Sequence, residues 1–399
     1  MIVKRMIVGL AVVLVLAGLL AVRSLYLAGA FKSIKPHTGC ERLVLGGIPG
    51  PEDIAIHPIT GRAFISSDDR RARAAGRDVP GRIFVLDPTA DVPAPRPLAR
   101  SAPADFHPHG ISLFAAADGQ TLLFAVNHKA VGPSVEIFEV AGDALIHKES
   151  IADPRLSSPN DILAVGPRRF YVTNDHGSRS RRGRDIEAYL FLRRASVLYF
   201  DGRALEVAAK RVGYANGIAM TPDGATVYVA GTTDRSIHAY KRDPASGRLT
   251  RSFRIKTGTA VDNLAVDSAG SLWAAAHPKL LRFARHAARP EALSPSQVLR
   301  IAAPHAEDAA VEELYLDDGR EISGSSVAAP FPGGFLVGQV FGDKVLLCRR
   351  CASEATPYLD PDLPLERRVA DLVARMTLEE KIAQMVHEAP AVDRLAVPA

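Results

Sequence analysis

The segment Thr221-Pro222-Asp223-Gly224 leads into the run Val227-Tyr228-Val229-Ala230. Asp, Pro and Gly favour a tight turn, and short runs of β-branched and aromatic residues favour a strand, so this stretch predicts part of a β-hairpin. The same turn-then-strand pattern recurs between residues 40 and 350, where helical periodicity is weak. The five further turns lie at 57–61, 117–119, 166–167, 267–270 and 331–334.

Six such units, spaced by roughly 45 to 65 residues, indicate a repeated architecture of propeller type. Four-stranded blades around an axis leave only short, protected strand edges. The sequence therefore predicts an all-β, six-bladed β-propeller over residues 40–350, with the ring closed by pairing of N-terminal and C-terminal strands. A pair of β-sandwiches would explain the hairpins but not their near-regular sixfold recurrence.

A polar residue or polar pair lies shortly before each turn and is followed by an apolar residue. Because equivalent points in the blades lie at the same height and radius, we expect these polar groups to meet at one end of the central channel. The six segments are Glu52-Asp53-Ile54, His109-Gly110-Ile111, Asn160-Asp161-Ile162, Asn216-Gly217-Ile218, Asp262-Asn263-Leu264 and Ser325-Ser326-Val327.

Most of these side chains offer oxygen atoms, which suits a hard cation. Calcium takes about 6–8 oxygen ligands in flexible geometry, whereas zinc and iron–sulfur sites favour cysteine clusters, which the sequence lacks. Without a cation, packed carboxylates would repel one another and their pKa values would rise. A turn or an Asx cap would explain any single residue, but not the set. The predicted calcium ligands are Glu52, Asp53, Asn160, Asp161, Asn216, Asp262 and Asn263.

The second unit carries an imidazole, His109, where the other units carry oxygen. The following strand of the same unit ends at His128. Two histidines on adjacent strands can hydrogen-bond, so that one acts as general base on a water molecule while the other sets its tautomer. A purely structural role is the alternative for either residue.

The N-terminal 1–30 segment differs in composition from the rest. Lys4 and Arg5 precede an apolar run over 6–22, which is close to the length of about 20 residues that a membrane-spanning helix needs. The pattern predicts an uncleaved signal anchor. A secretory signal peptide cleaved near 28–30 is the alternative. Both place the remaining chain outside the cytosol, in the periplasm or the extracellular space.

Composition excludes some functions. The net charge is only +5, with charges of both signs spread along the chain, so a nucleic-acid partner is not expected. The apolar content of 47% is sufficient for a large core.

Cys40, Cys348 and Cys351 are the only cysteines in the sequence. Disulfides persist outside the cytosol, and a Cys40–Cys348 bridge would join the two ends of one closed domain. A bridge from Cys40 to Cys351, or three unpaired thiols, are the alternatives.

Several motifs together resemble the serum paraoxonase/arylesterase family and occur in that family's order across residues 40 to about 350. The resemblance implies a six-bladed propeller that hydrolyses lactones, aryl esters and, in some members, organophosphates. The motifs include Pro51-Glu52-Asp53, Pro108-His109-Gly110-Ile111-Ser112, Val126-Asn127-His128, Pro159-Asn160-Asp161-Ile162-Leu163-Ala164-Val165-Gly166-Pro167, Asn174-Asp175-His176, Val261-Asp262-Asn263 and Ala276-His277-Pro278.

By matching motifs, the resemblance implies two calcium ions. The catalytic ion would be held by Glu52, Asn160, Asn216, Asp262 and Asn263. The structural ion would be held by Asp53, Asp161 and the backbone carbonyl of Ile111. The resemblance also implies that His109 and His128 form a catalytic dyad, that Cys40 pairs with Cys348, and that the N-terminal helix is retained.

The implied mechanism is polarisation of the substrate carbonyl by calcium and activation of water by His109 with His128. Glu52 is the competing candidate for the base. Two other functions remain open at this point: a gluconolactonase-like or phosphotriesterase-like propeller hydrolase, and a non-catalytic, membrane-tethered propeller scaffold.

The 177–194 segment departs from the family pattern. It surrounds the apolar run 186–192 with six arginines, and in the family this region forms a surface helix over the active site. Here it would contact an anionic membrane, or else form a solvated charged loop. The arginines are Arg179, Arg181, Arg182, Arg184, Arg193 and Arg194.

The tail, residues 351–399, has helical periodicity at Leu365, Val369, Leu372, Val373 and Met376. It resembles the opening of glycoside hydrolase family three, the β-glucosidase class. The chain stops before that family's catalytic segments, so sugar hydrolysis is not inferred.

Overall fold

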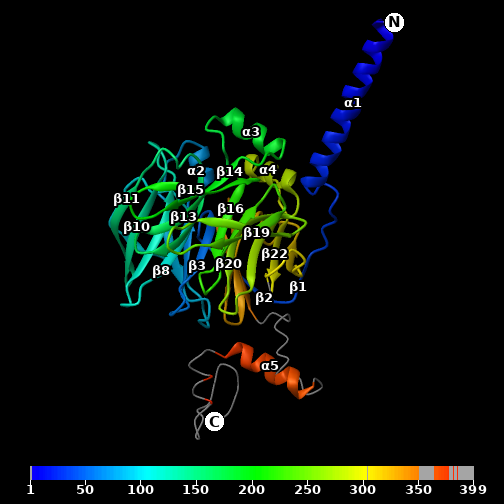
Figure 1. Ribbon diagram of the computed structural model, residues 1–399. Coiled ribbons are helices and arrows are strands. Elements are labelled where there is room, and N and C mark those ends of the chain that lie inside the picture. The colour runs from blue at the N-terminus through cyan, green and yellow to red at the C-terminus, as the bar shows by residue number, and fades with distance from the viewer. Residues whose placement is uncertain (1, 303, 350–363, 377–380, 382–383, 385–399) are drawn as a thin grey trace. The chain divides into compact units, whose positions relative to one another are not determined.

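Six β-sheets form the first of two units, residues 1–349, in this computed structural model (Figure 1). The second unit covers residues 350–399. The structure describes residues 2–302, 304–349, 364–376, 381 and 384. The predicted six-bladed β-propeller is confirmed.

The innermost strand of each sheet contacts the innermost strands of both neighbouring sheets, and the contacts close into a ring. In chain order these strands are β3 (Pro51–Ile56), β8 (Pro108–Ala115), β12 (Pro159–Gly166), β16 (Ala215–Met220), β20 (Ala260–Val266) and β24 (Ser325–Phe331).

The other strands follow outward in each sheet, antiparallel to one another. The second strands are β4 (Ala63–Ser67), β9 (Thr121–Asn127), β13 (Arg169–Asn174), β17 (Thr226–Gly231), β21 (Leu272–His277) and β25 (Gly334–Gln339). The third are β5 (Arg82–Leu86), β10 (Ser134–Ala141), β14 (Ala195–Phe200), β18 (Ser236–Arg242), β22 (Ser296–Ile301) and β26 (Lys344–Arg349). The outer strands are β6 (Arg96–Pro97), β11 (Ala144–Ile151), β15 (Leu205–Val212), β19 (Leu249–Lys256), β23 (Glu312–Asp317) and β2 (Glu41–Gly46). Two short strands extend two of the sheets: β7 (Ala99–Arg100), parallel to β11, and β1 (His37–Thr38), beside β23.

The N-terminal strand β2 pairs with β26, so the predicted closure of the ring is confirmed. The predicted Cys40–Cys348 disulfide is wrong. Cys348 is a buried free thiol, and its burial raises its pKa to about 12. Its partner in the strand register is Arg42 rather than Cys40, and diagonal neighbours in a sheet lie about 7–8 Å apart, too far for a disulfide. Cys40 is disulfide-bonded, and Cys351 lies outside the described residues.

Every inner strand contains a β-bulge at its polar segment. The register shifts fall at Pro51/Ile54, Pro108/Ile111, Pro159/Ile162, Ala215/Ile218, Val261/Leu264 and Ser325/Val327. A bulge removes residues from the hydrogen-bond ladder and re-aims their side chains. Two of the backbone N–H groups released in this way have hydroxyl partners on the second strand: Asp53 N donates to Ser66 Oγ at 3.0 Å, and Asp161 N donates to Thr173 Oγ1 at 3.0 Å.

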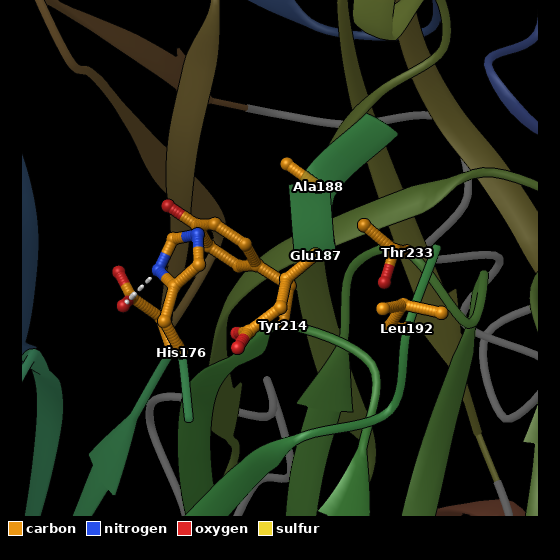
Figure 2. A pocket seen from close by; sticks show the side chains of 7 residues that line it. His176, Glu187, Ala188, Leu192, Tyr214 and Thr233 are labelled. Atoms are coloured by element: carbon orange, nitrogen blue, oxygen red, sulfur yellow. Dashed lines mark hydrogen bonds and ion pairs between the residues drawn. The ribbon is translucent and has the colours of Figure 1, made fainter. Parts of the chain in front are cut away.

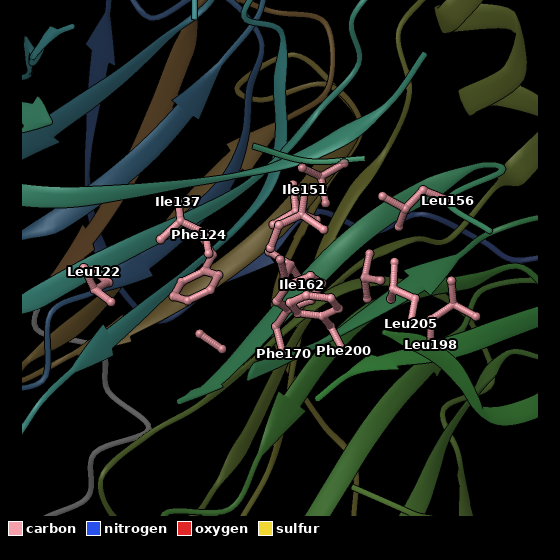
Figure 3. Packing of buried hydrophobic residues seen from close by; sticks show 14 residues of the cluster. Leu122, Phe124, Ile137, Ile151, Leu156, Ile162, Phe170, Leu198, Phe200 and Leu205 are labelled. Carbon is pink, nitrogen blue, oxygen red and sulfur yellow. The ribbon is translucent and has the colours of Figure 1, made fainter. Parts of the chain in front are cut away.

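The hydrophobic core is divided among the spaces between neighbouring blades. In one of them Phe124 and Ile137 from β9 and β10 pack against Ile162, Phe170 and others from β12 to β14 (Figure 3). Because successive side chains of a strand point to opposite faces, each blade has two apolar faces, and each face packs against one of the two neighbouring blades. The apolar contacts between blades therefore stabilise the ring without involving the polar residues at the inner-strand bulges.

Four helices accompany the propeller in the first unit: α1 (Ile2–Leu27), α2 (Arg70–Ala74), α3 (Arg181–Tyr189) and α4 (Leu280–Ala288). Gly9–Leu27 of α1 is long and apolar enough to cross a membrane, with a mean hydropathy of 2.3. A signal sequence would satisfy the same criterion. The chain joins the propeller directly after α1, because Ala28 O accepts a hydrogen bond from Leu280 N at the start of α4.

In the second unit, the described residues contain the helix α5 (Leu365–Arg375). This helix confirms the helical prediction for that part of the tail. The remainder of the predicted tail lies outside the described residues.

Candidate metal centre and histidine pair

The bulges bring the predicted polar residues together at one end of the ring. Asn263 Nδ2 donates to Glu52 Oε1 at 3.0 Å although the two residues lie 211 positions apart in the chain. All seven predicted side-chain ligands are at least 95% buried. Ile111, whose carbonyl is the eighth predicted ligand, is also buried, and its N–H donates to Asp53 Oδ2 at 2.7 Å.

Large and small residues alternate at the second bulge position around the ring. Blades one, three and five carry Asp53, Asp161 and Asn263, whereas blades two and four carry Gly110 and Gly217. A Cβ atom on Gly110 would lie 2.5 Å from Asp161 Cα, and one on Gly217 would lie 2.5 Å from Asn263 Cα. The two glycines therefore make room for side chains of the following blades.

Four buried oxygen atoms in this cluster have no hydrogen-bond partner within the described structure. They are Glu52 Oε2, Asn160 Oδ1, Asn216 Oδ1 and Asn263 Oδ1. Leaving one buried polar atom unpaired costs about 1–3 kcal/mol. Their concentration at equivalent bulges indicates a site that binds a ligand attracted to oxygen.

The carboxylates of the cluster raise one another's pKa values. Burial raises the pKa of Asp53 to about 8, and the charge of Glu52 adds to the effect. Burial and Asp53 raise the pKa of Asp161 well above its usual value. Burial also raises the pKa of Asp262, against the influence of its hydrogen bond to His277. A bound cation would remove this repulsion.

Glu52 differs from the other carboxylates. Burial opposes its ionisation, but the nearby His109 ring and Arg70 outweigh burial and lower the pKa of Glu52. His109 Nε2 lies 3.5 Å from Glu52 Oε1. The histidine thus borders the predicted metal ligands.

The two predicted catalytic histidines are neighbours. The His109 and His128 rings lie 5.0 Å apart in an edge-to-face arrangement. Neither ring hydrogen-bonds to the other in the described structure, so the hydrogen bond that adjacent strands would allow is not formed. Burial, with the positive charge of Arg70 nearby, lowers the pKa of His128 to about 3, so this ring is neutral.

The structure adds residues whose role the sequence did not indicate. His277 Nε2 donates to Asp262 Oδ2 at 2.7 Å. His176 Nδ1 hydrogen-bonds Asp175 Oδ1 at 2.6 Å, and its ring lies 4.9 Å from that of Tyr214. Figure 2 shows His176 and Tyr214 side by side, in a lining that includes Glu187 of α3. Asp175, His176 and His277 stood within recognisable motifs, so their identity was available from the sequence but their contacts were not.

The donor set fits calcium better than zinc. Within the described residues, no group of three or more His, Cys, Asp or Glu side chains is placed to hold a metal ion by itself. A site here therefore depends on the asparagine oxygens, and amide and carboxylate oxygens together are the donors that calcium prefers.

The fold is a six-bladed propeller, and buried oxygen-bearing side chains gather at one end of its ring. A sequence model of the arylesterase family matches residues 33–349. The chain therefore belongs to the arylesterase family.

Individual relatives agree with this assignment. Serum paraoxonase/arylesterase 2 of Rattus norvegicus is 36% identical over 77% of this chain and 88% of its own length. Serum paraoxonase/lactonase 3 of Homo sapiens is 37% identical over 75% of this chain and 85% of its own length. Among solved structures, a luciferin-regenerating enzyme matches with a TM-score of 0.50 at 12% identity, covering 77% of this chain and 95% of its own. This structural match supports the fold alone.

Proposed function

We propose that this chain is a calcium-dependent hydrolase of lactones and aryl esters. The observation that carries the proposal is the set of four unpartnered, buried oxygen atoms on Glu52, Asn160, Asn216 and Asn263. Membership of the arylesterase family, and the arylesterase and lactonase names of its relatives, support the class of reaction.

Two ions are proposed. One would be held by Glu52, Asn160, Asn216, Asp262 and Asn263. The other would be held by Asp53, Asp161 and the carbonyl oxygen of Ile111. Asp53 and Asp161 each also accept hydrogen bonds from the backbone of the following blade, from Ile111 N and Ile218 N. The second ion would therefore tie neighbouring blades together, whereas the first would face the substrate.

Calcium held by these residues would act as a Lewis acid, polarising the substrate carbonyl and favouring the negative charge that develops on its oxygen. The protein's own groups orient the water and move its proton. Glu52 and His109, 3.5 Å apart, are the candidates for that proton transfer. His128 packs against His109 and remains neutral, so its proposed role is to orient the other ring.

Hydrolysis of phenyl acetate and of an acyl lactone, measured with and without a calcium chelator, tests the proposal. We expect chelation to lower both rates by about 100-fold or more, and added calcium to restore them. We expect Asn216→Ala to lower both rates by a similar factor. Asp223→Ala, in the exposed turn of the same blade, is the matched control and should change them less than about twofold.

Other outcomes would redirect the proposal. Turnover of gluconolactone or a phosphotriester, without turnover of aryl esters or acyl lactones, would favour the other propeller hydrolases. A folded, calcium-binding protein that hydrolyses none of these substrates would favour a non-catalytic scaffold. His109→Ala and Glu52→Gln, compared over the same substrates, address which group acts as the base.

We also propose that α1 is an uncleaved anchor that holds the propeller on the periplasmic or extracellular side of a membrane, with a cleaved signal peptide as the alternative. Ile186, Tyr189 and Leu190 are exposed beside the arginines of 179–194, which supports contact of α3 with anionic lipid. The N-terminal mass of protein purified from the membrane fraction distinguishes anchor from signal. We further propose that the chain divides into the anchor segment 1–30, the propeller 40–350 and the tail 351–399.

A further inference from the structure

Two arginines of the short helix α2 form hydrogen bonds with residues of the candidate site. Arg70 Nη2 donates to His109 Nδ1 at 3.4 Å. Arg73 donates to Asp68 Oδ2 and to the backbone carbonyl of His128, both at 3.2 Å. Each of these two arginines therefore contacts one member of the histidine pair.

Arg70 is held in place independently of His109. Its Nη1 atom faces three backbone carbonyls, those of Gly50 at 3.3 Å, Val340 at 3.4 Å and Asp68 at 3.5 Å. The start of α2 is fixed by Asp69, whose side chain accepts a hydrogen bond from Ala72 N at 2.8 Å. The backbone carbonyls thus orient the Arg70 guanidinium, and its Nη2 atom is free to donate to the His109 ring.

The direction of the Arg70–His109 hydrogen bond sets the tautomer of His109. A guanidinium carries only donors, so His109 Nδ1 must accept. In a neutral imidazole the proton then lies on Nε2. Nε2 lies 3.5 Å from Glu52 Oε1, so its N–H group faces a carboxylate oxygen that can accept a hydrogen bond.

We propose that Arg70 is a positioning residue that holds His109 in the tautomer protonated at Nε2. His109 then presents an N–H, not a lone pair, toward Glu52 and the space beside it. His109 then serves the reaction as a hydrogen-bond donor. Of His109 and Glu52, only Glu52 has acceptor atoms directed at this space, so Glu52 is the candidate to accept the proton of the water. The catalytic part of this inference rests on the proposed function, whereas the tautomer assignment does not.

The tautomer is measurable without any substrate. Long-range proton–nitrogen correlation spectra of the full chain, labelled with nitrogen-15 histidine and loaded with calcium in detergent micelles, report which ring nitrogen carries the proton. His109→Gln identifies the His109 signals by their loss. We expect the Nε2–H pattern in the wild-type chain, and a mixed or Nδ1–H pattern in Arg70→Met.

Arg71→Met is the matched control on the same helix. Arg71 donates to the His286 carbonyl at 2.9 Å and lies over the Phe341 ring, and within the described residues it has no hydrogen bond to His109. We expect Arg71→Met to keep the Nε2–H pattern. A wild-type Nδ1–H pattern, or an unchanged pattern in Arg70→Met, would overturn the proposal even if the chain hydrolyses esters.

Kinetics supply the second readout. Loss of a group that orients a catalytic side chain costs about 10- to 100-fold in activity, so we expect a decrease of that size in kcat for Arg70→Met with KM changed less than about threefold. Arg70→Lys keeps a donor and should recover part of the rate together with the Nε2–H pattern. If Arg70→Met and Arg71→Met lowered kcat equally, α2 would have only a structural role.

Discussion

The inner-strand bulges and the interfaces between blades are built on opposite principles. At the interfaces, apolar side chains such as Phe170 are completely buried among others of their kind. At the bulges, carboxylates and amides are buried almost as deeply, but four of their oxygen atoms lack hydrogen-bond partners within the described structure and the carboxylates repel one another. Burial of apolar area stabilises the fold, whereas unpaired polar burial destabilises it. The ring therefore depends on the blade interfaces for its stability, and the bulges hold a polar set that the proposed cation would complete.

The largest effect that this comparison predicts is at a blade interface. Phe170 has no exposed surface and stacks on Phe200 with ring centres 5.1 Å apart. We expect Phe170→Ala to lower the free energy of unfolding by about 3–5 kcal/mol, as measured by denaturant unfolding in detergent. Calcium affinity of the folded fraction should not change. Phe31→Ala, at a side chain that is 69% exposed, is the control, and an equal loss there would contradict the comparison.

A smaller effect on stability, but a loss of calcium binding, is expected at the bulges. A Cβ at position 217 would meet Leu264 N at 2.4 Å, so the strands must shift. We expect Gly217→Ala to cost about 1–3 kcal/mol and to weaken calcium uptake in a calorimetric titration. In Gly46→Ala the new Cβ would meet nothing within 4 Å. Identical behaviour of the two variants would show that the alternation of glycine with larger residues has no role.

The last effect is expected from pH, which titrates the bulge carboxylates without altering the apolar contacts between blades. Burial raises the folded-state pKa of Asp53 from 3.8 to about 8, so between these values the folded state retains a proton that the unfolded state has lost. Stability is then fully present below the lower value and decreases as pH rises toward the upper one. We expect the melting temperature of the chelated protein to fall by a few degrees across this window.

Calcium should abolish that trend, because the ligands are then ionised throughout the window. Melting curves with and without calcium check both expectations. A melting temperature that rises with pH in the chelated protein would show that the bulge carboxylates are not held close together.

Much of the fold and the identity of most candidate ligands were predictable from the sequence. Turn chemistry and strand composition repeat six times, and the polar residues recur with them, so the sequence alone predicts that Glu52 and Asn263 meet at one end of the ring. Arg70 was not predictable. Its helix has only five residues, too few for a periodic signal, and its partner His109 lies 39 positions away.

The pairing of the cysteines also could not be predicted from the sequence. Cys348 and Cys351 were both possible partners for Cys40 from the sequence, but the strand register places Cys348 opposite Arg42, two positions from Cys40, and Cys348 is a free thiol.

The sequence by itself determined the class of fold, the family and the kinds of atoms at the site, because these depend on local turn and strand preferences repeated along the chain. The tertiary structure decided which atoms meet. The bulges turn the side chains of Asp53 and Asp161 to backbone groups of the next blade, the glycines at 110 and 217 make room for their neighbours, and Arg70 donates to His109. Those contacts depend on register and distance between segments far apart in the chain, which local preferences do not encode.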